Sequence, residues 1–320
     1  MSEPIISLGI AGSTDRTVQC AQVLFDDPRS HIEWVLTPQP KPIGRKKEVQ
    51  SNPLHQFAIH NSIESILIEK SIDQQIRNQL ETKNKIDILL VVDFGYIVPN
   101  WLLSLPAIAP INIHPSLLPR WRGSSPGQFV ILYGENESAV TVMTMNDKLD
   151  QGKIITQIPF TVDTSWDQQQ YYQHSFALVA EQLADILSQF ANEELTAHAQ
   201  PDESPTPMAA RLNREDGLIA WEILSDLVAG KVPSTEKLPQ VIKEASASHP
   251  SLAATIVAAC KAFSPWPGIW TYLSTNKGRQ RMKILSCSID DVNQQKLILE
   301  SVQLEGKPVT TWQQTKKYCA

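Results

Sequence analysis

Short apolar runs separated by segments of helical spacing fill the first two hundred residues. Strand-like runs lie at residues 5–11, 34–36, 86–92 and 108–114, and helical spacing marks residues 17–25 and 71–82. This alternation predicts an α/β fold with a parallel sheet and right-handed crossovers. Sites in such sheets lie beyond the carboxyl ends of the strands, so we expect functional side chains at that edge.

The pattern changes twice further along the chain. Residues 140–145 alternate as a strand, residues 146–152 predict a turn, and a second strand at 154–162 leads into one long helix at 163–190, capped by Asp163 or Thr164. Residues 38–53 are expected to form a loop. Residues 193–207 lack periodicity and predict a linker between a catalytic domain at 1–192 and a smaller domain at 208–320. A helix at 251–263 and short strands at 270–309 give that domain a mixed or β-barrel character.

Composition narrows the class of protein. A chain of 320 residues is long enough for two domains, and a net charge of −6 leaves nucleic-acid binding to local basic patches. Cys20, Cys260, Cys287 and Cys319 lie far apart, which argues against a zinc site or a disulfide framework, and no metal is expected. The sequence has no signal-peptide pattern and no membrane-spanning apolar run, so we expect a cytoplasmic protein.

The candidate chemistry lies at the end of the run at 108–114. Asn112 and His114 are two residues apart, so they share one face of the strand, and Asp150 follows in a Leu-Asp-Gln-Gly segment. Together these side chains suit acyl transfer to an amine: an amide N–H and an imidazolium stabilise a developing oxyanion, the imidazole moves the proton, and the carboxylate orients it. Taken alone, the pair also fits a structural cluster and Asp150 an ordinary turn.

The sequence motifs of several other enzyme classes are absent. Gly9 and Gly12 do not belong to the Gly-x-Gly-x-x-Gly spacing of a dinucleotide-binding turn, and no Walker, His-Glu-x-x-His or Gly-x-Ser-x-Gly motif is present. We expect these glycines to permit a tight turn of the chain. Ser116 lies close to His114, but direct transfer to an amine requires no acyl-enzyme.

With these residues in view, the chain resembles the methionyl-tRNA formyltransferase family over nearly its whole length. The resemblance rests on Asn-Ile-His-Pro-Ser-Leu-Leu-Pro at 112–119, Arg-Trp-Arg-Gly at 120–123, Leu-Asp-Gln-Gly at 149–152 and Phe-Ser-Pro-Trp-Pro at 263–267. It implies a Rossmann-like formyltransferase domain followed by a smaller, shortened β-barrel (OB-like) domain.

The same resemblance implies a reaction and a set of roles. The formyl group of 10-formyltetrahydrofolate passes to the α-amine of initiator methionyl-tRNA, in a monomeric enzyme without a membrane partner, with Asn112, His114 and Asp150 as catalytic residues. The residues expected to bind folate are Phe94, Gly95, Tyr96, Ile97, Ser116, Leu117, Leu118, Pro119 and Asp147. Those expected to contact tRNA are Lys41, Arg45, Lys46, Lys47, Arg120, Arg122, Arg279, Arg281 and Lys283.

The same residues also fit purely structural roles. The aromatic side chains at 94 and 96 also suit the protein core, and the charged residues at 41–47 and 279–283 also suit a solvated surface. Within the enzymes, the alternatives are a sugar-amine or ribonucleotide N-formyltransferase or a formyltetrahydrofolate hydrolase. Outside them, the alternative is a catalytically silent RNA-binding relative.

Three departures from the family pattern are visible. Asp93 stands where the family has Ala, residues 222–250 look inserted, and the C-terminal barrel looks short. The first adds a carboxylate near the expected pocket, and the last bears on tRNA binding without touching the chemistry.

Overall fold

The computed structural model describes residues 5–43, 48–275 and 278–318, which form two compact units that alternate along the chain. The first comprises Met1–Arg122, Ala139–Pro159 and Gln173–Pro207, and the second Gly123–Ser138, Phe160–Tyr172 and Met208–Ala320. The boundaries expected from the sequence, 1–192, 193–207 and 208–320, remain a prediction about domains.

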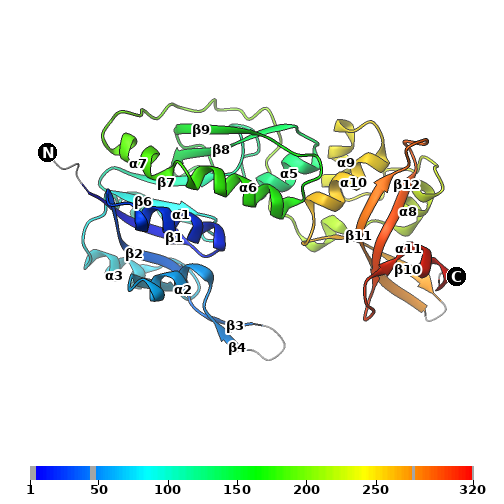
Figure 1. The fold of residues 1–320 in the computed structure, drawn as a ribbon, viewed down its shortest axis with the longest axis horizontal. Helices are drawn as coiled ribbons and strands as arrows, with labels where there is room; N and C mark the ends of the chain where they lie inside the picture. The colour runs from blue at the N-terminus through cyan, green and yellow to red at the C-terminus, as the bar shows by residue number, and fades with distance from the viewer. Residues whose placement is uncertain (1–4, 44–47, 276–277, 319–320) are drawn as a thin grey trace. The chain divides into compact units, whose positions relative to one another are not determined.

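A seven-stranded sheet forms the centre of the first unit (Figure 1). Its spatial order is β5-β2-β1-β6-β7-β8-β9, and the first five strands are parallel whereas β8 runs antiparallel to β7. The strands are β1 (Ile6–Gly12), β2 (Ser30–Pro38), β5 (Glu64–Ile68), β6 (Ile88–Val92), β7 (Ala109–His114), β8 (Glu137–Thr144) and β9 (Ile154–Thr161). The predicted parallel sheet is therefore confirmed for the first five strands, and β8 departs from the prediction.

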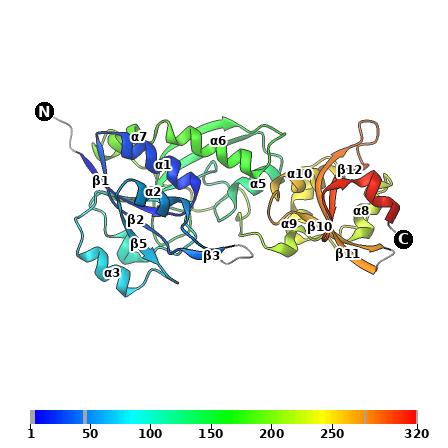
Figure 2. The ribbon, with the colours of Figure 1, turned by 60° about the horizontal axis from the view of Figure 1, so that its bottom comes forward.

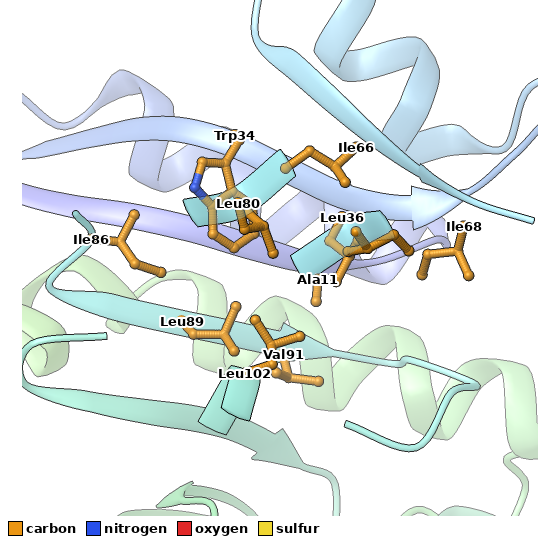
Figure 3. Packing of buried hydrophobic residues seen from close by; sticks show 11 residues of the cluster. Ala11, Trp34, Leu36, Ile66, Ile68, Leu80, Ile86, Leu89, Val91 and Leu102 are labelled. Carbon is orange, nitrogen blue, oxygen red and sulfur yellow. The ribbon is translucent and has the colours of Figure 1, made fainter. Parts of the chain in front are cut away.

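Helices flank this sheet (Figure 2). They are α1 (Asp15–Asp26), α2 (Pro53–His60), α3 (Gln74–Glu81), α4 (Asn100–Leu103), α6 (Gln168–Ala180) and α7 (Leu183–Ala191). One face of the sheet buries Ala11, Leu36 and Val91 against side chains of α3 and α4, in the cluster shown in Figure 3. Gly9 is needed in β1 because a Cβ atom there would lie 2.4 Å from the Trp34 ring.

The structure differs from the sequence prediction in several segments of this unit. Residues 38–53 contain an antiparallel pair, β3 (Lys41–Ile43) with β4 (Glu48–Gln50), in place of a plain loop. The single helix expected at 163–190 is two helices, and α6 begins only at Gln168 because the Asp163 carboxylate accepts from the Ser165 amide in a turn. Helix α2 and the edge strand β5 were not predicted from the sequence. Strand β5 gives a weak apolar pattern because it is short and fully buries only Ile66 and Ile68.

In the second unit, where the sequence predicted a smaller mixed or β-barrel (OB-like) domain, the strands form an antiparallel sheet. Its described strands run in the order β10 (Ile269–Thr275), β11 (Gly278–Ile289), β12 (Leu297–Leu304) and β13 (Thr310–Thr311). The helices of this unit are α5 (Pro126–Leu132), η1 (Arg214–Gly217), α8 (Trp221–Val228), α9 (Gln240–Ala245), η2 (Ser246–Ser248), α10 (Leu252–Ala262), α11 (Trp312–Thr315) and η3 (Lys316–Tyr318). The inserted-looking residues 222–250 thus supply most of α8 and all of α9, which bury Leu224, Leu227 and Ile242. Nowhere in the described part of the chain is a helix long and apolar enough to cross a membrane.

Candidate active site

The carboxyl end of β7 presents two polar side chains on one face of the sheet. Ile111 and Ile113 are 0% and 2% exposed and point into the core, so Asn112 and His114 share the opposite face. The register pairs Asn112 with Val91, which places Asn112 on the face that α3 and α4 cover. Its Nδ2 donates to the Val91 carbonyl at 3.1 Å. An amide nitrogen carries two hydrogens, so this bond fixes the amide while the second N–H can donate to a substrate.

His114 is buried, with 5% of its surface exposed. Its Nε2 lies 3.0 Å from the main-chain carbonyl of Trp121, which can only accept, so Nε2 carries the proton in the neutral ring. Nδ1 then has a lone pair, and it faces the Asp150 carboxylate with 3.8 Å between Nδ1 and Oδ1. That separation is too long for a direct hydrogen bond, but it lies within the range of an ion pair when Nδ1 takes up a proton.

Asp150 reaches His114 from the turn between β8 and β9. Its φ of +52° lies in the left-handed region, which aspartate tolerates better than most residues. Gly152 allows the turn to fold back closely, because a Cβ atom there would lie 1.6 Å from the Thr144 carbonyl oxygen. The structure therefore brings together the three residues that the sequence predicted to be catalytic.

The segment between β7 and α5 folds over His114. Ser116 Oγ donates to the Arg120 carbonyl at 2.8 Å, while Thr141 of β8 donates to the Ser116 carbonyl at 2.7 Å. Ser116 and Leu118 are 0% and 2% exposed, whereas Leu117 and Pro119 are partly exposed. Of the four residues at 116–119 that were expected to bind folate, only Leu117 and Pro119 are therefore accessible to a ligand.

A hollow lies on the same face of β7. Pro110 lines it and alternates with Asn112 and His114 along the strand. The hollow measures about 360 Å³ and is lined by Asn100, Leu103, Ser104, Pro110, Met145, Asn146 and Asp147. Of the residues expected to bind folate, Asp147 lines this hollow. Phe94 and Tyr96 pack, like Met145, against the core cluster, Gly95 is exposed, and Ile97 is 93% exposed.

The structure gives a partner to Asp93, the unusual carboxylate after β6. Asp93 adopts a φ of +46°, and its Oδ2 accepts from Arg16 Nη1 at 2.9 Å and from Thr14 Oγ1 at 2.8 Å. Both donors belong to the start of α1. Asp93 therefore ties the segment 94–97 to α1 at the carboxyl edge of the sheet.

The basic residues expected to contact tRNA differ in how far they are exposed to solvent. Arg122 is 5% exposed, and its guanidinium donates to Gln200 Oε1 and to the carbonyls of Pro201 and Asp202. This buried position does not fit the predicted contact between Arg122 and tRNA. Arg120 is partly exposed and lies over the Trp121 ring, and Lys41 is exposed on β3, whereas Arg45, Lys46 and Lys47 lie outside the described residues.

On β11 of the second unit, the three basic residues do share one face. Arg279 and Lys283 are exposed and Arg281 is partly exposed, whereas Met282 and Ile284 on the other face are buried. The Arg279 guanidinium lies 4.1 Å from the centre of the Tyr272 ring, and Arg281 pairs with Glu305 at 3.1 Å. A cationic face with an aromatic ring is suited to contact a nucleic-acid backbone.

Pro110 and Gln200 belong to this site but were not predicted from the sequence. Pro110 could have been found, because it continues the alternation of Asn112 and His114. Gln200 could not, because it lies in the segment 193–207 that has no periodicity, and only the folded chain brings it beside Asp150.

Similarity to known proteins extends over more than half of the chain. The formyl transferase family matches residues 10–185, which include Asn112, His114 and Asp150. This chain belongs to the formyl transferase family. Members of this family take the formyl group from a formyl-tetrahydrofolate donor.

Individual relatives of this formyl transferase agree with that assignment. A methionyl-tRNA formyltransferase of Legionella pneumophila (strain Corby) is 31% identical over 216 residues, 68% of this chain and 68% of the relative. A solved methionyl-tRNA formyltransferase from Clostridium thermocellum has a TM-score of 0.54 at 12% identity, covering 94% of this chain and 99% of the other. A sugar 3N-formyl transferase, solved in the presence of dTDP and 5-N-formyl-THF, has a TM-score of 0.58 at 18% identity over 90% of this chain and 87% of the other. The two solved structures show the fold.

Proposed function

We propose that this formyl transferase transfers the formyl group of 10-formyltetrahydrofolate to the α-amine of initiator methionyl-tRNA. The observation that carries the proposal is the arrangement of Asn112, His114 and Asp150 at the end of β7, in a chain that is 31% identical to a methionyl-tRNA formyltransferase. Because charged tRNA is a cytoplasmic substrate, we place the reaction in the cytoplasm, and we expect a monomer.

Each catalytic side chain has a role that follows from its contacts. The second N–H of Asn112 is directed to the formyl oxygen, where negative charge grows during attack by the amine. Nδ1 of His114 takes the proton of the attacking amine, because Nε2 is held by the Trp121 carbonyl. Asp150, 3.8 Å away, then stabilises the imidazolium and keeps Nδ1 directed into the site. The imidazolium returns the proton to the folate nitrogen, which leaves as its bond to the formyl carbon breaks.

Both substrates have regions suited to them. We place the folate ring system in the hollow beside Asp147, with residues 94–97, Leu117 and Pro119 around it, because this hollow opens on the face of β7 that carries the catalytic pair. For the tRNA, we propose contacts with Lys41, Arg45, Lys46, Lys47 and Arg120, and with Arg279, Arg281 and Lys283 on β11.

One assay tests the proposal. Purified protein is incubated with 10-formyltetrahydrofolate and either charged initiator tRNA or a nucleotide-linked sugar amine, and the formylated product is measured. We expect product with methionyl-tRNA only. Formylation of the sugar amine alone would assign the chain to sugar formyl transfer, and hydrolysis of the donor without any acceptor would make it a hydrolase.

A further inference from the structure

Gln200 connects two parts of the first unit that both border the catalytic residues. Its Nε2 donates to the carbonyl of Asp150 at 3.0 Å and to that of Gly152 at 2.8 Å. Its Oε1 accepts from Arg122, at 2.9 Å from Nη2 and 3.2 Å from Nε. A single side-chain amide therefore uses its donors on the turn that carries Asp150 and its acceptor on Arg122.

Arg122 fixes the other end of this connection. It directly follows Trp121, whose carbonyl holds His114 Nε2 at 3.0 Å. The guanidinium is buried and also donates to the carbonyls of Pro201 and Asp202 at 2.7 and 3.0 Å, so it cannot move without leaving several carbonyls unpaired. Because Arg122 is fixed in this way, Gln200 links the segment that orients His114 with the turn that presents Asp150.

The turn at Asp150 needs such support. Its left-handed φ of +52° is not a preferred conformation for a residue with a side chain, and its carboxylate lies 3.8 Å from His114 Nδ1, beyond hydrogen-bond distance of that nitrogen. The Gln200 amide bonds the carbonyls at residues 150 and 152, on both sides of Gln151. These two bonds fix the orientation of the main chain there and with it the direction of the Asp150 side chain.

We propose that Gln200 is a positioning residue for formyl transfer, which holds the Asp150 turn against Arg122 so that the carboxylate stays beside His114. The inference rests on the proposed function. It assigns to residues 193–207 a part in catalysis that the linker interpretation does not contain. Gln200 itself touches no substrate, so its effect reaches the reaction only through Asp150.

Two substitutions at Gln200 distinguish its bonds to the carbonyls at 150 and 152 from its bonds with Arg122. Gln200→Met removes both the donors and the acceptor while keeping the length of the side chain. Gln200→Glu keeps an acceptor for Arg122 but cannot donate to the carbonyls at 150 and 152. We expect both variants to fold, as circular dichroism will show, and both to lower kcat by roughly 10- to 100-fold, as expected for misplaced catalytic groups.

Three features of the kinetics distinguish positioning from a general loss of structure. The KM values for the folate donor and for methionyl-tRNA stay within about threefold of the wild type, since Gln200 does not bind either substrate. In an Asp150→Ala background, Gln200→Met lowers kcat no further, because the residue that it positions is absent. The matched control is Thr196→Ala, an exposed position on the same segment, which keeps full activity.

A measurement without substrate keeps this inference separate from the proposed function. The ring ¹⁵N resonances of His114, identified by their loss in His114→Gln, are recorded at one fixed pH. We expect Gln200→Met and Gln200→Glu to move them in the same direction as Asp150→Asn, and Thr196→Ala to leave them in place. If both Gln200 variants leave these resonances unchanged, the inference is wrong even if methionyl-tRNA is formylated. If they move while the wild type formylates a different amine, only the proposed acceptor is wrong.

Discussion

The side-chain nitrogen of Asn112 donates to the main-chain carbonyl of Val91 across 3.1 Å, from one parallel strand to its neighbour. A carbonyl accepts only, so this contact determines which end of the Asn112 amide faces the sheet and aims the remaining N–H at the site. The donor is thus oriented before substrate binds, which is the condition under which an oxyanion contact lowers a barrier most.

Asn112→Ala should therefore cost about 3 kcal/mol of transition-state stabilisation, seen as a fall in kcat, while folate affinity changes much less. Steady-state kinetics combined with equilibrium binding of the donor checks this. A loss of affinity as large as the loss of kcat would instead make Asn112 a residue that positions the substrate.

His114→Ala should lower kcat by roughly 10²- to 10⁴-fold, the usual contribution of a general acid–base group. The fold should persist, since the ring lies at the carboxyl rim of the sheet and only Nε2 is bonded to the main chain at Trp121. Comparison of kcat with the circular dichroism spectrum separates the two effects. Near-normal turnover in a folded variant would remove His114 from the mechanism.

Asn112 and His114 were predictable from the sequence because the pattern that identifies them lies within one strand. Strand alternation alone puts Asn112 and His114 on one face, and Pro115 ends the strand just beyond them. Asp150 was predictable as a site residue only through its motif, since nothing local shows that its turn folds back to His114. Gln200 and the burial of Arg122 depend on contacts between segments about 80 residues apart, which no local pattern records.

Asp93→Ala tests whether the carboxylate after β6 acts through α1. Its pair with Arg16 is about one third exposed, so we expect the free energy of unfolding to fall by less than about 1 kcal/mol. Release of residues 94–97 should raise the KM for folate several-fold, up to roughly tenfold, and leave the KM for tRNA unchanged.

Arg16→Met provides the second arm of the Asp93 experiment. Because Asp93→Ala already removes the contact with Arg16, adding Arg16→Met should change the folate KM of that variant little further. Strictly additive effects on the folate KM would show that Asp93 and Arg16 act separately.

Alkaline pH should destabilise the first unit through Cys20. Complete burial in α1 raises the pKa of its thiol to about 12. The folded state therefore holds this proton more tightly than the unfolded chain, where the pKa is about 8.5. The stabilisation is complete below about pH 8.5 and is lost as pH rises towards 12, by up to about 1.4 kcal/mol per pH unit.

Urea unfolding at pH 7.5 and pH 10 measures this contribution of Cys20, with Cys20→Ala as the reference for all other titrating groups. The wild type should lose more unfolding free energy between the two pH values than the variant. An identical loss in the two proteins would show that the Cys20 thiol does not titrate differently on folding.

The basic face of β11 gives the last prediction, which concerns tRNA. Arg279, Arg281 and Lys283 lie on the face of β11 opposite the buried Met282 and Ile284, and Arg279 lies 4.1 Å from the centre of the Tyr272 ring, so its guanidinium is held at the surface. If these side chains meet phosphates, replacing all three with Ala should raise the KM for tRNA by at least tenfold, about 1.4 kcal/mol. The slope of log KM against log salt should also fall by roughly 0.7 to 0.9 for each phosphate that the variant no longer neutralises.

Lys243→Ala, an exposed lysine of α9 in the same unit, controls for a general change of charge. Arg279→Lys should recover only part of the affinity, because an ammonium group lacks the planar face that stacks on Tyr272. A tRNA KM and salt slope that match the wild type in the triple variant would leave this face as ordinary solvated surface.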